Sequence, residues 1–183
     1  PEAMTRLLTL IAMCLALTAC VAQRLAPGPG PTTPQFVDQG HWMAHDGYVL
    51  GMSQWQAPNA DIVIIALHGM NDYGQFIDAA AKNWQSHGIT TYAYDQRGFG
   101  RTEGNGRWPG HDVMAQDART FIALVREKHP NARVYLMGES MGAAVAMVAA
   151  GGRSEPIADG IILVSPALWG WSNLDVIKRS LPT

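Results

Sequence analysis

The stretch LMGESMGAAV, residues 136–145, places Ser140 between two glycines, behind an apolar run and ahead of an alanine-rich one. Residues 138–142 match the pattern G-x-S-x-G, in which a strand turns sharply into a helix and holds the serine in a strained backbone conformation. Gly138 and Gly142 are required because side chains at these positions would collide across the turn. A serine hydroxyl is a weak nucleophile until a base takes its proton. The stretch therefore predicts Ser140 as a nucleophile and raises the question of which residues activate it.

Strand-like and helix-like segments alternate on both sides of this turn. The apolar runs of strand length are residues 62–67, 90–94, 133–137 and 161–165. The segments with helical spacing are residues 76–87, 114–125 and 143–150. This alternation predicts an α/β fold whose sheet is mostly parallel, with helices on both faces. Ligands of such sheets bind at the carboxyl ends of the strands, and Ser140 follows one of those ends.

An antiparallel pair is expected ahead of the parallel strands. Residues 36–43 and 48–56 are β-like and flank Asp46-Gly47, which is a hairpin turn signal.

The 183 residues are 48% hydrophobic and 15% charged, a balance that fits one globular domain. The formal net charge of −2 gives no electrostatic case for a nucleic-acid partner. The sequence indicates neither a metal site nor a cofactor, and it leaves the oligomeric state open.

The N-terminal residues have the pattern of an exported lipoprotein. An apolar run over residues 7–17 is too short to span a bilayer as a mature helix. It ends in LTAC, residues 17–20, which resembles the lipobox of bacterial lipoprotein signals. The resemblance implies cleavage before Cys20 and lipidation of that cysteine, which would anchor the protein to the membrane. An ordinary secretory signal cut nearby is the alternative.

This pattern divides the chain into three parts. Residues 1–19 are expected to be the signal peptide with a few upstream residues, and residues 20–35 a Pro/Gly-rich tether that cannot hold a helix. Residues 36–183 are then the N-terminal part of the folded domain. The lipid anchor implies the cell envelope of a bacterium. Because Val21 and not an acidic residue directly follows Cys20, the expected location is the periplasmic side of the outer membrane.

A second segment adds a possible oxyanion hole. ALHGMND, residues 66–72, follows the first parallel strand with a His-Gly pair. An oxyanion hole needs two backbone amides that converge on one oxygen, one after the serine and one from this first loop. Met141 and Met70 occupy these two positions. His68 is in the wrong loop for a general base, so we interpret it as a structural histidine hydrogen-bonded inside its turn.

Three motifs together resemble the monoacylglycerol lipase and lysophospholipase branch of the α/β-hydrolases, which is grouped with the serine aminopeptidase S33 family. They are LHGMNDYGQF, YAYDQRGFGRTEG and GESMGAAVA, in the family's order and spacing. The resemblance implies an α/β-hydrolase fold with Ser140 as the nucleophile and the amides of Met70 and Met141 as the oxyanion hole. It implies a structural role for Asp95 in the turn after the second parallel strand. Asn71 departs from the family pattern, which often has glycine there.

The same resemblance shows what is missing. The family's triad runs Ser, then Asp or Glu, then His, whereas all six histidines here precede Ser140. Asp159 falls at the wrong end of its strand, and the stretch around residue 167 resembles the start of the family's cap. His111 and Asp112 are a second-choice pair, although nothing in the sequence places them beside Ser140. The acid and the base are therefore expected beyond Thr183, and the 183-residue chain is expected to be an inactive N-terminal fragment.

Two classes of function fit these patterns. The first is a serine hydrolase that cleaves carboxylic esters, such as monoacylglycerols or lysophospholipids, through an acyl-enzyme on Ser140. The second is a lipoprotein that uses the fold as a non-catalytic binding module. An α/β-hydrolase that cleaves thioesters or amides lies between them, because a fold alone does not decide the chemistry.

Overall fold

The computed structural model describes Met4, Arg6 and residues 24–168 of the chain. The expected signal peptide, Cys20 and most of the expected cap therefore lie outside the described residues. Among the helices of the described part, none is long and apolar enough to cross a membrane.

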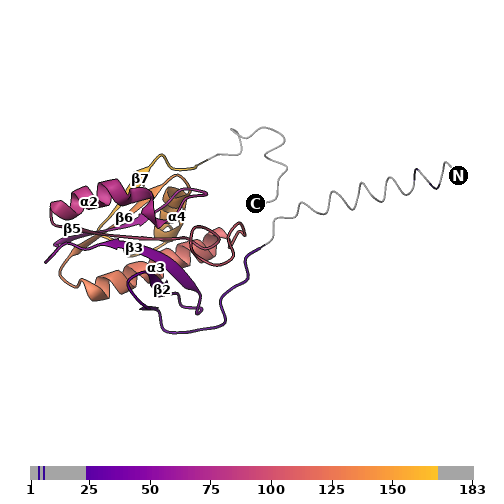
Figure 1. Cartoon of the computed structure of the whole chain (residues 1–183), viewed down its shortest axis with the longest axis horizontal. Helices are drawn as coiled ribbons and strands as arrows, with labels where there is room; N and C mark the ends of the chain where they lie inside the picture. Colours follow the sequence, from indigo (N-terminus) through magenta and orange to yellow (C-terminus); the bar gives the residue numbers. More distant parts are fainter. Residues whose placement is uncertain (1–3, 5, 7–23, 169–183) are drawn as a thin grey trace.

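The described strands form one mixed sheet in the order β1-β2-β3-β5-β4-β6-β7 (Figure 1). They are β1 (Gln35–Phe36), β2 (His41–Met43), β3 (Val49–Trp55), β4 (Ile62–Leu67), β5 (Ile89–Tyr94), β6 (Arg133–Glu139) and β7 (Gly160–Val164). β4 pairs in parallel with β5 and β6, and β6 with β7, whereas β1, β2 and β3 are antiparallel to their neighbours. The mostly parallel core and the N-terminal antiparallel strands are both confirmed.

The strand expected over residues 36–43 is two short strands instead, which pair with each other through Phe36 and Trp42. The interruption is a turn built on Asp38. Its Oδ1 accepts a hydrogen bond from the backbone N of Gly40 at 2.6 Å and lies 3.0 Å from Nδ1 of His41. A side chain that bonds its own backbone two residues on competes with the strand ladder, and here it reverses the chain.

Helices cover both faces of the sheet, as the alternation predicted (Figure 1). They are the 3-10 helix η1 (Gly74–Ile77) and the α-helices α2 (Asp78–Ser86), α3 (His111–Lys128) and α4 (Met141–Ala150). α2 covers one face, where Ala81 packs against Trp55 and Ala93. α3 and α4 cover the other face, which holds the larger core. That core centres on an aromatic group in which the Phe121 ring lies 4.9 Å from Trp42 and 5.0 Å from Tyr94.

The centre of the sheet and its β7 edge differ in how they are covered. β5 is buried from Thr90 to Tyr94, although every residue of that stretch except Ala93 carries a hydroxyl. β7 is apolar, yet its residues 161–164 are each between 36% and 41% exposed. Within the described residues β7 is the last strand of the sheet, so its outer edge is unpaired there. This strand corresponds to the apolar run over residues 161–165 of the sequence.

The segment over residues 24–34 is extended, as expected of a Pro/Gly-rich stretch, but it lies along the domain. The backbone N of Leu25 donates to the carbonyl of Trp108, and that of Gly30 to the carbonyl of Asp46. The backbone N of Gly28 donates to Oδ2 of Asp46 at 2.9 Å. This part of the expected tether is therefore attached to the folded body.

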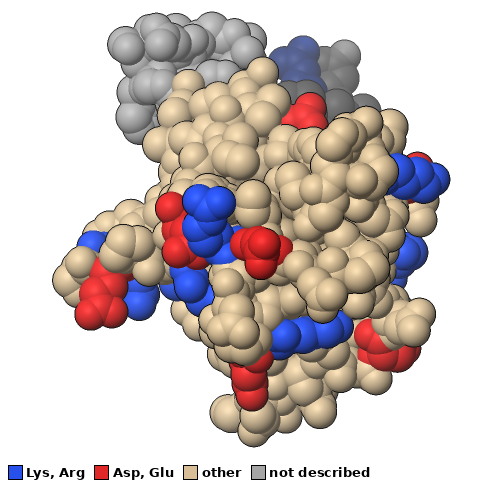
Figure 2. Space-filling model, turned by 90° about the vertical axis from the view of Figure 1, so that its left-hand side faces the viewer, with Lys and Arg blue, Asp and Glu red and all other residues tan. Residues whose placement is uncertain are grey.

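On the surface drawn in Figure 2, basic and acidic side chains lie side by side, in keeping with the small net charge.

Candidate active site

Ser140 lies at the turn between β6 and α4, in the conformation that the G-x-S-x-G pattern predicts. Its φ is 51° and its ψ is −111°, a region that non-glycine residues rarely adopt and that costs about 1–3 kcal/mol. Gly138 is required for the steric reason given above, whereas Gly142 is required because the neighbouring strand β4 lies against it. A Cβ on Gly138 would overlap the backbone of Gly142, and a Cβ on Gly142 would overlap the carbonyl of Leu67. The strand and the helix therefore approach each other as closely as their backbones allow.

The backbone of Ser140 is held on both sides. Its N donates to the carbonyl of Val164 at 2.9 Å, and its carbonyl accepts from the backbone N atoms of Ala144 and Ala167 at 3.2 and 3.1 Å. The residue is only partly buried. These contacts fix the strained conformation while leaving the side chain at the surface of the turn.

The loop after β4 lies against the elbow. A Cβ on Gly69 would be 3.5 Å from the Cβ of Ser140, so the His-Gly segment and the serine, 71 positions apart in the sequence, are neighbours in the fold. Met70 follows with an exposed side chain, and Asn71 has a φ of 63°. Met141 is the first residue of α4, where backbone N–H groups have no partner within the helix. The structure thus brings the loop that contains Met70 to the start of the helix that contains Met141.

His68 is a structural residue, as the sequence analysis proposed. Its side chain is fully buried, its Nδ1 lies 2.7 Å from the carbonyl of Gly69, and its Nε2 accepts from the backbone N of Gln96 at 2.9 Å. The Nδ1–H tautomer of a neutral ring satisfies both contacts, and burial lowers the pKa of His68, which favours this neutral form. With both nitrogens occupied, the ring cannot act as the general base for Ser140.

Asp95, directly after β5, is structural as well. Its Oδ1 accepts from the backbone N of Gly74 at 2.7 Å, and its Oδ2 from the backbone N and Nε of Arg101 at 2.7 and 2.8 Å. Burial raises the pKa of Asp95, but the hydrogen bonds from Arg101 and Gly74 outweigh burial and hold that pKa below its usual value. Both carboxylate oxygens accept hydrogen bonds from Gly74 or Arg101, so the carboxylate is unavailable for catalysis.

Sequence reasoning missed the part of this turn that lies between Asp95 and Arg101. Gln96 makes two hydrogen bonds to His68. Its backbone N donates to Nε2 of the ring at 2.9 Å, and its side-chain Nε2 donates to the His68 carbonyl at 2.8 Å. Arg97 is buried and forms ion pairs with Asp117 of α3 and with Asp46 of the hairpin turn, each with a contact of 2.6 Å. The available signal was a run of three polar residues directly after a buried strand, since buried polar groups need partners.

None of the six histidines supplies a hydrogen bond to Ser140. His41 pairs with Asp38, His87 contacts the carbonyl of Asn83, and His129 contacts the hydroxyl of Tyr92. The second-choice pair of His111 and Asp112 is mostly exposed at the start of α3, with 3.4 Å between His111 Nε2 and Asp112 Oδ1. No described contact joins that pair to Ser140.

The acids that follow Ser140 in the described residues are also engaged elsewhere or exposed. Asp159 precedes β7, where its Oδ2 accepts from the backbone N of Val134 at 2.7 Å and from Arg126 at 3.0 Å. This is the end of the strand away from the elbow, as the sequence analysis expected. Glu155 is exposed. Within residues 24–168, no group of three or more His, Cys, Asp or Glu side chains could hold a metal ion.

Comparisons with known proteins agree with this geometry. The family model described as serine aminopeptidase, S33 matches residues 58–182. The monoglyceride lipase of Rattus norvegicus is 27% identical over 146 residues, and that of Homo sapiens is 26% identical over 144 residues. These matches cover 78% and 77% of this chain but only 48% and 47% of the two lipases. The chain therefore spans about half the length of the curated relatives it matches.

Solved structures show the same fold. The α/β-hydrolase GrgF from Penicillium sp. sh18 has a TM-score of 0.60 at 25% identity, covering 69% of this chain and 44% of that protein. A soluble variant of monoglyceride lipase from Saccharomyces cerevisiae, solved with a substrate analogue, has a TM-score of 0.60 at 21% identity, covering 77% and 48%. The chain thus has an α/β-hydrolase fold, and it belongs to the serine aminopeptidase S33 family.

Proposed function

We propose that this protein is a serine hydrolase that cleaves carboxylic esters through an acyl-enzyme on Ser140. The observation that carries the proposal is the backbone of Ser140, held at φ 51° where β6 meets α4, with the Gly69 loop against it. Strained residues of this kind persist only where the surrounding structure enforces them, and they cluster at sites of chemistry. A binding module would gain nothing from holding a serine in this conformation.

The reaction follows from the two loops at this site. The Ser140 hydroxyl attacks the ester carbonyl carbon, and its proton passes to a general base. The backbone N–H groups of Met70 and Met141 hold the negative charge that develops on the carbonyl oxygen. The partial positive charge at the start of α4 adds to this stabilisation. The base returns the proton to the departing oxygen, so that the alcohol leaves and the acyl-enzyme forms. The base then takes a proton from a water molecule, whose oxygen attacks the acyl carbon, and passes that proton to the Ser140 oxygen as the acid is released.

The substrate class that we propose is a monoacylglycerol or a lysophospholipid. Support comes from the names of the relatives, since the rat and human proteins are monoglyceride lipases. The monoglyceride lipase from Saccharomyces cerevisiae was solved with a substrate analogue, and the carboxyl esterase from Bacillus coagulans with glycerol. These ligands belong to those proteins, and for this chain they guide the choice of assay.

We further propose that the acid and the base of the triad lie beyond Thr183. Two observations support this. The described histidines bond to other groups or stand exposed. The chain also matches only about half of each related lipase. The base would then come from a later loop at the carboxyl edge of the sheet, where Ser140 lies.

A membrane location is part of the proposal. The LTAC sequence at residues 17–20 supports lipidation of Cys20, which would place the domain on the periplasmic side of the outer membrane. Cys20→Ser should abolish the lipid and shift the protein out of the membrane fraction or leave it unprocessed. Unchanged processing and membrane association in this variant would exclude the anchor without affecting the proposed chemistry.

The catalytic proposal is tested with a fluorophosphonate probe, which reacts only with activated serines. We expect no labelling of the 183-residue chain. We expect labelling of a longer protein that includes the residues after Thr183, and loss of this labelling in Ser140→Ala. Hydrolysis of p-nitrophenyl esters should follow the same pattern. A longer protein that neither labels nor hydrolyses esters would favour the binding-module function, and labelling of the 183-residue chain would show that a base lies within it.

A further inference from the structure

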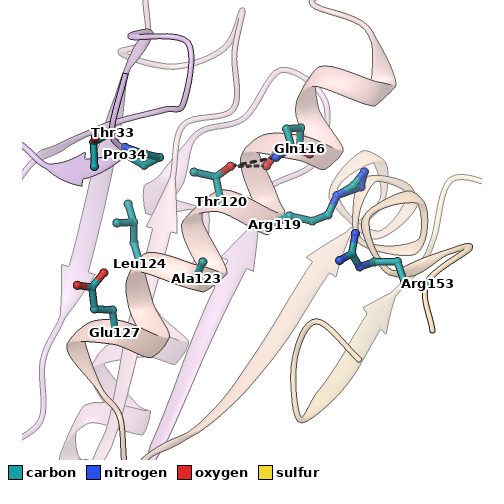
Figure 3. Close-up of a pocket in the computed structure, with 9 residues that line it drawn as sticks. All are labelled: Thr33, Pro34, Gln116, Arg119, Thr120, Ala123, Leu124, Glu127 and Arg153. Atoms are coloured by element: carbon teal, nitrogen blue, oxygen red, sulfur yellow. Dashed lines mark hydrogen bonds between the residues drawn. The ribbon is translucent and has the colours of Figure 1, made fainter. Parts of the chain in front are cut away.

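A pocket of about 460 Å³ lies on the outer side of α3, away from the candidate active site. The extended N-terminal segment forms one wall through Thr33 and Pro34, α3 forms the floor, and Arg153 from the loop after α4 closes one end (Figure 3). None of the lining residues belongs to the elbow or to the loop after β4. The pocket is therefore a separate feature of the surface.

Two arginines dominate this end of the pocket. Arg119 and Arg153 come from different elements, and their guanidinium groups point toward each other (Figure 3). In the part of the chain that the structure describes, the arginines in ion pairs with carboxylates are Arg97, Arg101 and Arg126. Arg119 and Arg153 are not among them. Two like charges that face each other repel unless an anion lies between them.

The Nε atom of Arg119 gives a second, independent indication. It is buried, and it makes no hydrogen bond to any of the described residues. Buried donors in native proteins are almost always paired, so an unpaired one calls for an explanation such as a bound ion. The neighbouring Thr120 hydroxyl is bonded to Gln116 instead, since it donates to the Gln116 carbonyl at 2.9 Å and accepts from Gln116 Nε2 at 3.4 Å (Figure 3).

The rest of the pocket defines the chemistry of the ligand. Ala123 and Leu124 give the floor an apolar stretch beside the two arginines. Glu127 is the one carboxylate among the described lining residues, and it lies two helical turns from Arg119, or about 12 Å along the axis. Its side chain points away from the arginine pair (Figure 3). An anion at the arginine end is therefore not opposed by a nearby negative charge.

We propose that Arg119 and Arg153 form a binding site for a phosphate group. The phosphate oxygens would accept from the terminal nitrogens of the two guanidinium groups, and Arg119 would turn toward the anion to uncover its Nε for one of them. Guanidinium groups present planar, paired donors that match phosphate oxygens, which makes arginine the usual residue for such sites. The phosphate could be free in solution or part of a phospholipid headgroup, whose glycerol and acyl carbons would lie along the apolar floor.

The test is a titration of the 183-residue chain, in a mild non-ionic detergent, followed by NMR of the arginine Nε–H groups. One arm uses inorganic phosphate, and the other uses dihexanoyl-phosphatidylglycerol below its micelle concentration. We expect saturable binding with the largest shift at the Nε–H of Arg119. The variants Arg119→Met and Arg153→Gln should each weaken binding by about tenfold, because each removes charge-assisted hydrogen bonds.

Arg126→Gln is the matched control. It removes one positive charge from the same helix, but at a residue that already pairs with Asp159 at 3.0 Å. Its affinity should equal that of the wild type, and a thermal melt of each variant checks folding. Because Arg153 is exposed in a loop, Arg153→Gln keeps the test valid if Arg119→Met unfolds the protein.

Each outcome decides the proposal. Binding of inorganic phosphate that both arginine variants weaken supports a phosphate site, and binding of the lipid alone, with the same loss, supports a headgroup site. Absence of saturable binding in both arms overturns it. Binding that Arg126→Gln weakens as much as Arg119→Met also overturns it, because the effect would then be one of overall charge.

Discussion

Two turns of this molecule look alike in sequence and differ in structure. One follows β5 and begins with Asp95, and the other follows β6 and contains Ser140. The two strands flank β4, and their turns lie at the same edge of the sheet. In the first turn the polar side chain is fully engaged, since Asp95 accepts from Gly74 and Arg101. In the second turn the backbone of Ser140 is strained, and none of the described histidines is hydrogen-bonded to the Ser140 hydroxyl.

On the proposed function, the difference separates a polar residue that stabilises the fold from one that is placed for chemistry. Hydrogen bonds that use every acceptor of a buried group lower the energy of the native state and leave nothing for a substrate. A strained residue without such bonds raises the energy of the native state, and the surrounding fold must offset it. Variants of the two turns test this difference.

The largest effect should be that of Ser140→Ala on catalysis in a protein that contains the complete triad. Loss of the nucleophile should lower kcat by about 10³-fold or more, leaving only catalysis by binding and the oxyanion hole. The measurement is ester hydrolysis at saturating substrate. Asp95→Asn serves as the comparison, and it should leave kcat within about tenfold of the wild type wherever the protein is folded. If the two variants lost activity equally, the distinction between the turns would be wrong.

The next effect is steric and concerns stability. Gly142→Ala should lower the free energy of unfolding by about 3 kcal/mol, because the new Cβ would overlap the carbonyl of Leu67 and force β4 and α4 apart. Urea denaturation followed by circular dichroism measures this. Gly40→Ala is the control, since a Cβ there would have its nearest neighbour, an Asp38 oxygen, at 3.6 Å. A loss under 1 kcal/mol for Gly142→Ala would show that the elbow is not closely packed.

A smaller loss is expected for Asp95→Asn, about 2 kcal/mol, because one carboxylate oxygen becomes an NH₂ group that faces donors from Arg101 or Gly74. The same variant tests the pH dependence. The pKa of Asp95 lies below its usual value of 3.8 in the folded state, so its contribution is present above that pH and is lost as the pH falls through the folded pKa. The wild type should therefore lose stability below about pH 4 more steeply than Asp95→Asn.

The control for this experiment is Asp112→Asn at the start of α3. Asp112 is 86% exposed and lies 3.4 Å from His111, an arrangement that contributes little to stability. Its removal should change the free energy of unfolding by less than about 0.5 kcal/mol. An acid-stability profile that is the same for Asp95→Asn and the wild type would show that the Asp95 contacts do not stabilise the fold.

The strands, the elbow and the hairpin could be predicted because each depends on nearby residues. The apolar run at 62–67 marks a buried strand by itself, and the steric need for Gly138 can be worked out from the turn alone, whereas Gly142 is confined by Leu67 of β4. The role of Arg97 could not be predicted, because its partners Asp46 and Asp117 are 51 and 20 positions away. For the same reason the packing of residues 24–34 against the domain was unexpected.

The candidate site was predictable to the same extent. The pattern identified Ser140 and the loop that lies against it, since both follow buried strands that end at one edge of the sheet. Sequence did not show that Gln96 holds His68 through two hydrogen bonds, because no motif links an amide side chain to a histidine 28 positions earlier. Hydrogen-bond partners, which sequence shows poorly, are what separate Asp95 and His68 from Ser140.

The smallest effect should be a gain in stability. Ser140→Gly should raise the free energy of unfolding by about 1 kcal/mol, because glycine adopts a φ of 51° and a ψ of −111° without the steric penalty that a Cβ brings. The gain is offset in part by the greater freedom of glycine in the unfolded chain. Ser140→Ala is the control in this experiment, since it keeps the Cβ and should leave stability within about 0.5 kcal/mol of the wild type. Chemical denaturation of the 183-residue chain measures both, with no need for activity. If Ser140→Gly were less stable than Ser140→Ala, the backbone at residue 140 would carry no strain, and the elbow would resemble the relaxed turn at Asp95.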